Sequence, residues 1–225
     1  MNSQNVKDEN TLLIRIHADN TAAVDYVLDG TVIHKSLSVI EIVKALKQSS
    51  YSKCVAESGL LPKNCIAFSR DMETDGRYYV IEHTERKSDI VYHNTAYTDF
   101  PLPRLVFGFG VSSDGRVCRI NVAVVGQDGG LNEETPLYHF PFSNVSGFAM
   151  CTGSNKLPVY KKASSLNSLP NYLLMLPNND DHYNKSHNKF GLGYRELLEH
   201  LKDKSPDYYY SDVLVQSGKK LKDFI

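Results

Sequence analysis

The stretch LYHFPFSNVSGFAMCTG, residues 137–153, places an asparagine and a cysteine seven residues apart, at Asn144 and Cys151. It has neither the alternation of a strand nor the spacing of a helix, which predicts an irregular loop. A cysteine thiolate is a good acyl acceptor, and attack of an amine on the resulting thioester creates an oxyanion that needs a hydrogen-bond donor. The carboxamide of Asn144 can supply that donor if the loop folds back over the thiol. His139 lies nearby in the sequence and is a candidate base.

The same residue types also have a purely structural interpretation. Pro141, Asn144 and Gly147 are turn formers, and Cys151 can pack beneath such turns as a small apolar side chain. Spacing alone leaves both interpretations open, because one asparagine and one cysteine meet few of the criteria for an active site. The exposure of the sulfur and the position of the Asn144 amide decide between them.

The composition is that of an ordinary globular protein. The chain has 225 residues, of which 41% are hydrophobic and 23% charged, with a formal net charge of −1. This length can bury a sizeable core, and the charge indicates neither a general nucleic-acid binder nor an acidic disordered tail. No apolar run is long enough to span a bilayer, and the polar start MNSQNVKDEN is not a signal peptide. We therefore expect a soluble, cytoplasmic protein without a membrane partner.

The four cysteines, Cys54, Cys65, Cys118 and Cys151, contain no C-x-x-C pair and no zinc-ligand spacing. In a reducing cytosol each is expected to be a free thiol, and we expect neither a metal ion nor a cofactor. Cys118 lies in the run RVCRINVAVV and is expected to be a buried strand residue. Cys151 differs, because its neighbours are loop formers.

The elements that must position this loop begin with a β-β-β-α unit, assigned to residues 1–69. Its expected strands are Leu12–His17, Ala22–Leu28 and Thr31–Lys35. Asp29-Gly30 predicts a tight hairpin turn between the last two strands. A helix follows in SVIEIVKALKQ, where Ser38 and Glu41 form a capping box. The expected apolar stripe of this helix comprises Val39, Ile42, Val43 and Leu46.

The sequence of residues 70–225 predicts an antiparallel meander followed by helices. The expected strands are Tyr78–His83, Asp89–His93, Leu105–Phe109 and Arg116–Val125, the first two forming a pair across a charged turn. The expected helices are Ser164–Met175 and Leu192–Lys202. The apolar end of the tail is expected to dock on the body. Strands, then an irregular loop with a cysteine, then helices indicate an α+β fold.

Two further segments carry side chains that could bind ligands. Asp180, Asp181, His182 and His187 could form a hydrated divalent-metal site, but their spacing is not a recognised ligand pattern, so solvation is the favoured interpretation. PDYYYSD brings three tyrosines together without flanking Lys or Arg. We therefore expect a packed or partner-facing aromatic patch rather than a surface for nucleic acid.

Five segments occur in the same order as in a known family: LLPKNCIAFS, FPLPRLVFGF, TPLYHFPFSNV, CTG with the following Pro158, and KKLKDFI. Through them the chain resembles PRTRC system protein B, the prokaryotic ubiquitin-conjugating-enzyme-like family D of plasmids and integrative elements. The matching features are a Leu-Pro stretch before the sheet, a Pro-x-x-Leu-Val-Phe strand, a central Asn-Val and Cys-x-Gly signature, and the C-terminal end. The resemblance runs through most of the sequence.

The resemblance implies a ubiquitin-conjugating-enzyme-like core, which here follows the N-terminal β-β-β-α extension. It implies that Cys151 accepts a ubiquitin-like protein as a thioester from a ThiF-type adenylating enzyme, with Asn144 as the oxyanion stabiliser. The rival interpretation is a non-catalytic interaction or scaffold module of the same mobile-element system, which keeps the fold without the chemistry. The loop from Asn144 to Cys151, one residue shorter than in the eukaryotic enzymes, favours the rival.

Overall fold

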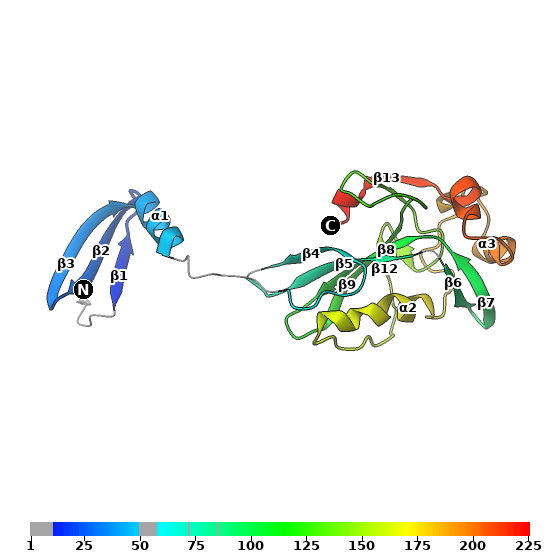
Figure 1. Ribbon diagram of the computed structural model, residues 1–225, viewed down its shortest axis with the longest axis horizontal. Coiled ribbons are helices and arrows are strands. Elements are labelled where there is room, and N and C mark those ends of the chain that lie inside the picture. The colour runs from blue at the N-terminus through cyan, green and yellow to red at the C-terminus, as the bar shows by residue number, and fades with distance from the viewer. Residues whose placement is uncertain (1–10, 50–57, 72, 85) are drawn as a thin grey trace. The chain divides into compact units, whose positions relative to one another are not determined.

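The computed structural model describes residues 11–49, 58–71, 73–84 and 86–225. The chain forms two compact units, Met1–Glu57 and Ser58–Ile225. Mostly antiparallel sheets with a few helices confirm the expected α+β class (Figure 1). No helix among the described residues is long and apolar enough to cross a membrane.

The first unit consists of a three-stranded antiparallel sheet and one helix. In chain order these are β1 (Leu12–Ile16), β2 (Thr21–Leu28), β3 (Thr31–Ser38) and α1 (Val39–Ser49). The expected turn at Asp29-Gly30 joins β2 to β3, and both residues have positive φ angles, as a tight hairpin turn requires. The capping box is also confirmed: the Ser38 N–H donates to Glu41 Oε2 at 2.8 Å, and the Glu41 N–H donates to Ser38 Oγ at 3.2 Å.

The core of the first unit is small. Ala22, Val24 and Ile42 are buried together, whereas Val43 and Leu46 of α1 are 44% and 48% exposed. The expected apolar stripe of α1 is therefore only partly buried. Successive residues are rotated by about 100° around a helix, so Val43 turns away from the sheet that Ile42 faces; this rotation does not account for the exposure of Leu46, which lies one turn after Ile42.

The second unit is built around an antiparallel sheet of eight strands. Six of them lie in the order β11-β12-β9-β8-β5-β4, and β10 pairs with β9 and β13. Their bounds are β4 (Cys65–Arg70), β5 (Arg77–His83), β8 (Leu105–Val111), β9 (Val117–Val124), β10 (Pro136–Tyr138), β11 (Val145–Ser146), β12 (Ala149–Met150) and β13 (Gln216–Lys220). A separate two-stranded sheet contains β6 (Arg86–Tyr92) and β7 (Thr95–Leu102).

The expected pairing of Tyr78–His83 with Asp89–His93 is wrong. β5 pairs with β4 on one side and with β8 on the other, so it has no free edge for β6. β6 pairs instead with β7. A short turn that begins at His93, whose φ is +49°, connects the two strands and lets β6 form a hairpin with the strand that follows it.

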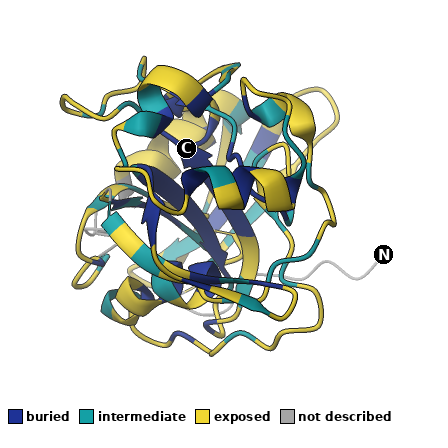
Figure 2. Ribbon diagram, turned by 90° about the vertical axis from the view of Figure 1, so that its right-hand side faces the viewer, coloured by how far each residue is buried: buried dark blue, intermediate teal, exposed yellow. Residues whose placement is uncertain are grey.

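Alternate residues of the central strands face opposite sides of the large sheet. The larger core includes Tyr79, Ile81, Phe107, Phe109, Val122, Leu173 and Leu198. The smaller core, on the other face, is formed by Val80, Val106, Ala123, Val125, Leu137, Leu221 and Phe224. In Figure 1, α2 lies below the sheet, and β13 and the C-terminus lie above it. The buried strands between these layers appear dark blue in Figure 2. The expected docking of the tail is confirmed.

Gly108 of β8 is required where the tail crosses the sheet. A Cβ atom at this position would lie 1.9 Å from the Tyr78 hydroxyl oxygen. That hydroxyl donates to the Phe224 carbonyl at 3.0 Å, so it cannot move away without releasing the tail. The glycine therefore lets the tail approach the strand closely.

The helical third of the chain is more irregular than the sequence predicts. Its elements are η1 (a 3-10 helix, Ala163–Ser168), α2 (Leu169–Leu174), η2 (a 3-10 turn, Lys185–His187), α3 (Tyr194–Leu201), η3 (a π-helix, Tyr209–Val213) and η4 (a 3-10 turn, Leu221–Asp223). The helix expected over Ser164–Met175 is thus divided, and only its second part is α-helical. Pro170 lies in the first turn of α2, where its missing N–H costs no hydrogen bond.

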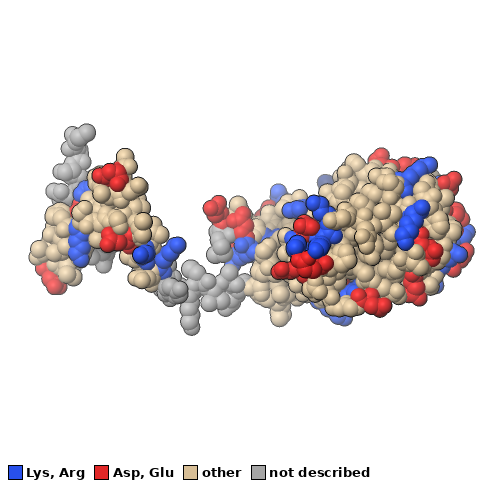
Figure 3. Space-filling model, turned by 90° about the horizontal axis from the view of Figure 1, so that it is seen from above, with Lys and Arg blue, Asp and Glu red and all other residues tan. Residues whose placement is uncertain are grey.

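The tyrosine cluster is packed rather than presented to solvent. Tyr209 is completely buried, and its hydroxyl donates to the Pro101 carbonyl at 2.8 Å. The Tyr210 hydroxyl accepts from the Arg104 N–H at 2.8 Å. On the face of the second unit seen in Figure 3, Lys and Arg side chains are interspersed with Asp and Glu. Tyr209 and Tyr210 therefore belong to a packed patch, one of the two arrangements expected for this cluster.

His83, at the end of β5, makes stability depend on pH. Its side chain is 9% exposed, and its Nε2 atom has no hydrogen-bond partner among the described residues. Burial, with a smaller contribution from the Arg86 guanidinium, lowers the pKa of His83 to about 4. The unfolded chain therefore binds a proton below pH 6.5 that the folded protein does not bind until about pH 4.

We expect the free energy of unfolding to fall by up to about 3 kcal/mol from this histidine as the pH decreases from 6.5 to 4. Urea unfolding measured at several pH values checks this. In His83→Phe, the free energy of unfolding should depend less on pH between 6.5 and 4. The smaller dependence that remains comes from other histidines with lowered pKa values. An unchanged slope in His83→Phe would contradict the assignment.

Candidate functional site

Cys151 follows directly after a short β-hairpin that is attached to the large sheet and has two residues in each strand. β11 and β12 pair through Val145↔Met150 and Ser146↔Ala149. The turn between them contains Gly147 with a φ of +60°, a conformation that favours glycine. The hairpin joins β9, because the Val122 N–H donates to the Phe148 carbonyl at 2.8 Å. Cys151 is thus held at the end of a structured hairpin, and its side chain is exposed.

The hairpin brings Asn144 and Cys151 side by side. The Cys151 N–H donates to the Asn144 carbonyl at 2.8 Å, and the Asn144 N–H donates to the Asp181 carbonyl at 2.8 Å. Asn144 has a φ of +61°, a left-handed conformation that asparagine tolerates better than most residues. The segment from Asn144 to Cys151 is therefore a closed loop, and the backbone hydrogen bond between these two residues holds its ends together.

Asn144 and Cys151 line one cavity of about 200 Å³. Its other lining residues are Thr152, Gly153, Ser154, Asn155, Leu176, Pro177, Asn179 and Asp181. The Gly153 N–H points at the Cys151 sulfur at 3.4 Å. Asp181 is the only other ionisable residue in this lining. The cavity therefore combines an exposed thiol, a side-chain amide and a carboxylate, which are groups that acyl transfer to an amine can use.

His139, the sequence's candidate base, is not among the residues that line this cavity. Its ring stacks on the ring of His187, with the centroids 4.1 Å apart and the planes 6° from parallel. Burial lowers the pKa of His139, and its Nδ1 atom has no partner among the described residues. The structure thus brings together two of the three candidate residues, Asn144 and Cys151, and assigns the third to a histidine pair.

The side chains of the polar loop that follows α2 form hydrogen bonds and ring contacts with neighbouring residues. Asp180 accepts from the Tyr92 hydroxyl at 2.7 Å and lies 3.3 Å from His93 Nε2, and these contacts, the Tyr92 bond first, lower the pKa of Asp180. Asp181 fixes Asn144 through its carbonyl, and His187 belongs to the histidine pair. Within the described ranges, no three His, Cys, Asp or Glu side chains are grouped to hold a metal ion.

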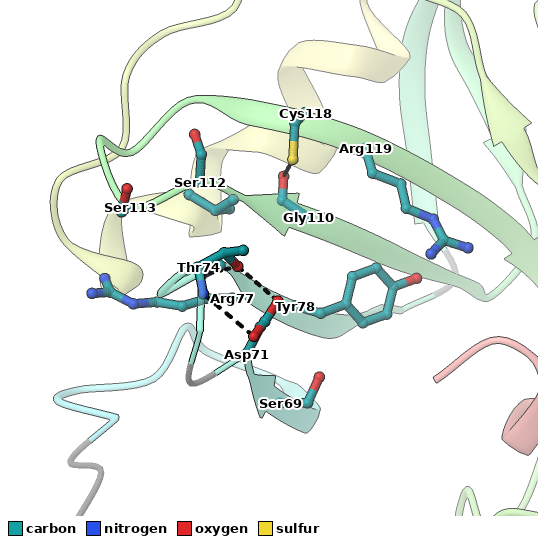
Figure 4. A pocket seen from close by; sticks show the side chains of 12 residues that line it. Ser69, Asp71, Thr74, Arg77, Tyr78, Gly110, Ser112, Ser113, Cys118 and Arg119 are labelled. Carbon is teal, nitrogen blue, oxygen red and sulfur yellow. Dashed lines mark hydrogen bonds between the residues drawn. The ribbon is translucent and has the colours of Figure 1, made fainter. Parts of the chain in front are cut away.

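Cys118 is exposed, contrary to the burial expected from its strand. The reason is a β-bulge, because Gly110 pairs with Arg119 and Val111 with Val117, which leaves Cys118 as the extra residue. Its Sγ donates to the Gly110 carbonyl at 3.4 Å. Cys118 and Arg119 line a hollow of about 360 Å³, shown in Figure 4. This hollow is lined by a different set of residues from the Cys151 cavity, which makes Cys118 a useful control thiol.

The surroundings of the cysteines predict their order of alkylation. Cys118 and Cys151 are exposed, whereas Cys65 is partly buried, and burial raises the pKa of its thiol. Because the thiolate is the reactive form, iodoacetamide at pH 7.5 should modify Cys65 at least about tenfold more slowly than either exposed cysteine. Peptide mapping after timed quenching measures each rate. Cys65 reacting as fast as Cys151 would contradict the described burial. Cys54 lies outside the described residues.

Sequence reasoning assigned no role to two groups that contact Asn144. The Asp181 carbonyl holds its backbone, and the Asn178 side chain lies 3.5 Å from its amide. Both come from the loop after α2, more than thirty residues along the chain. In the sequence this loop was marked only as a possible metal site, and no pattern indicated its contact with Asn144.

Comparison with known families gives one match. A family model described as prokaryotic E2 family D matches residues 39–217. This region begins at the first residue of α1 and includes the whole Cys151 cavity. Searches of curated proteins and of solved structures gave no match.

Proposed function

The chain belongs to prokaryotic E2 family D, and we propose that it carries a ubiquitin-like modifier as a thioester on Cys151 and transfers it to an amine. The modifier would come from a ThiF-type adenylating enzyme. These partners and the link to a PRTRC-type mobile element are taken from the sequence resemblance, and the cytoplasmic location is the expectation from the composition of the sequence. The proposal places the reaction in the 200 Å³ cavity that contains the exposed thiol.

One observation carries the proposal: the 2.8 Å hydrogen bond from the Cys151 N–H to the Asn144 carbonyl. It supports a loop that closes over the cysteine and keeps the Asn144 side chain at the same cavity. The thiol is exposed, as an acyl carrier needs to be, because its partner must reach the sulfur.

The transfer would proceed in two steps. In the first, the Cys151 thiolate attacks the activated carbonyl carbon at the C-terminus of the modifier; a C–S bond forms and the activating group leaves with its electron pair. In the second, a neutral amine attacks the thioester carbon, and the resulting oxyanion accepts a hydrogen bond from Asn144 Nδ2. Collapse forms the amide, breaks the C–S bond and releases Cys151 as a thiolate, while the amine proton passes to water. The Asp181 carboxylate attracts the amine in its ammonium form, which gives one proton to water before the neutral amine attacks.

The alternative from another class is an interaction module without transfer chemistry. Besides the short loop from Asn144 to Cys151, one structural feature favours it: His139 is absent from the lining of the cavity and stacks on His187. That feature removes a candidate base but leaves the acyl carrier and the oxyanion donor, so we favour the transfer function.

The test is a reconstitution with the purified chain, a ThiF-type adenylating enzyme, the ubiquitin-like protein and ATP. Non-reducing intact-mass spectrometry should detect an adduct of the chain with the modifier, and dithiothreitol should remove it. An absent adduct, when adenylation of the modifier is demonstrated in the same tube, would reject the carrier function and favour the interaction module.

A further inference from the structure

Asn178 is fastened to the end of β6 by its own backbone. Its N–H donates to the Val91 carbonyl at 2.7 Å, and its carbonyl accepts from the His93 N–H at 2.9 Å. These two bonds form an isolated parallel bridge between Tyr92 and Asn178. The loop after α2 is therefore tied to the two-stranded sheet at this residue, so the position of its Cα atom is determined from outside the Cys151 hairpin.

The orientation of the Asn178 carboxamide is determined as well. Its Nδ2 donates to the carbonyls of Val91 and Leu176, both at 3.2 Å. The Oδ1 atom accepts from Ser143 Oγ at 3.2 Å and from Asn144 Nδ2 at 3.5 Å. The flipped carboxamide would place Oδ1 against two carbonyl oxygens, so only the observed orientation satisfies all four partners.

Because the Oδ1 atom of Asn178 is an acceptor, the atom of the Asn144 carboxamide that faces it is the nitrogen, Nδ2. Asn144 Nδ2 carries two hydrogens, and Asn178 Oδ1 accepts one of them. The second hydrogen has no acceptor among the described residues, and Asn144 lines the cavity of Cys151. Without Asn178, the carboxamide of Asn144 is free to rotate and to offer its oxygen, which would repel an oxyanion.

We propose that Asn178 is a positioning residue that acts through Asn144. Its Oδ1 holds one Asn144 amide hydrogen so that the other is available to the oxyanion formed on the Cys151 thioester. This inference rests on the proposed transfer function, because it assigns Asn178 a part in the second step. A hydrogen-bond donor that is oriented before the oxyanion forms can stabilise it without reorganisation of the site during the reaction.

The test isolates that second step and needs no protein partner. The full chain is loaded by thiol exchange with the mercaptoethanesulfonate thioester of N-acetylglycine, the excess is removed, and L-lysine is added. Peptide-level mass spectrometry follows the loss of the acyl adduct from Cys151, in a Cys118→Ala background that removes the second exposed thiol of the described residues. Attack of the lysine amine forms a C–N bond, breaks the C–S bond and returns the Cys151 thiol.

Four proteins form the comparison: the parent, Asn178→Ala, Asn144→Gly and the double variant. Glycine is used at residue 144 because alanine would be strained at a φ of +61°. Asn178→Ala should slow aminolysis at least about tenfold. The double variant should be no slower than Asn144→Gly alone, because Asn178 can act only while the Asn144 side chain is present. Asn132→Ala is the matched control; Asn132 Oδ1 accepts a hydrogen bond too, from the Glu134 N–H at 2.9 Å, but it has no contact with Asn144.

A second readout separates positioning from a general structural role. Alkylation of Cys151 by iodoacetamide builds no oxyanion, so its rate should be unchanged in Asn178→Ala, whereas a distorted loop would change it. The inference is overturned if Asn178→Ala reacts with lysine as fast as the parent, if its effect multiplies with that of Asn144→Gly, or if alkylation changes in parallel. A parent no faster than Asn144→Gly would instead reject the proposed transfer chemistry, and the positioning role with it.

Discussion

Cys151→Ala is expected to abolish the thiol-labile adduct with the modifier. Alanine removes the only sulfur in the cavity that also contains Asn144, and no other lining side chain offers a nucleophile that forms a thioester. The side chain of Cys151 is exposed, so its truncation leaves no cavity in the core and should not change the unfolding midpoint. Intact-mass spectrometry under non-reducing conditions measures the adduct.

Cys118→Ala is the matched control for this loss. Cys118 is also an exposed free thiol, but it lines the hollow of Figure 4 beside Arg119. It should load as the wild type does. Retention of a thiol-labile adduct in Cys151→Ala, together with its loss in Cys118→Ala, would move the carrier site to the sheet hollow.

Asn144→Gly is expected to leave loading detectable but to slow transfer of the acyl group to an amine by about 10²–10³-fold, the usual effect of removing one oxyanion donor. The rate of loading, which is a thioester exchange, should fall less than the rate of transfer, because a thiolate is a stronger nucleophile than an amine. The substitution keeps the φ of +61° and the backbone bonds to Cys151 and Asp181. The lost rate can then be attributed to the side chain. Single-turnover decay of the loaded protein with lysine measures it.

Asn144→Asp provides the complementary control. Aspartate has a similar shape and tolerates the same backbone conformation, but its carboxylate has no N–H donor and would repel the oxyanion. We expect transfer at least as slow as in Asn144→Gly. Transfer at the wild-type rate in either variant would show that Asn144 does not stabilise the oxyanion.

The sequence predicted the elements that depend on local chemistry. Asp29-Gly30 needs only its own positive φ angles to make a turn, and Ser38 with Glu41 caps α1 within one helical turn. The segment with Asn144 and Cys151 was predicted to be an irregular loop, and whether it folds back was left open. The structure instead forms the short β11–β12 hairpin between the two residues, because Gly147 makes a turn that lets the flanking pairs of residues form a ladder.

The features that the sequence could not predict depend on distant partners. β6 pairs with β7 because β5 is already paired on both sides, with β4 and with β8. Cys118 is exposed because one extra residue bulges opposite Gly110, and a bulge leaves no sequence pattern of its own. Asn178 reaches Asn144 only after α2 and β6 have packed, so the spacing between them carries no signal.

The most direct test of the central claim is to locate the acyl group in the loaded wild-type protein. The reconstituted adduct is quenched at low pH, digested without reductant and analysed by tandem mass spectrometry. The account predicts that the C-terminal residue of the modifier is attached to the peptide that contains Cys151, through a bond that dithiothreitol cleaves. Attachment to another cysteine, or to a lysine through a thiol-resistant bond with Cys151 unmodified, would contradict it.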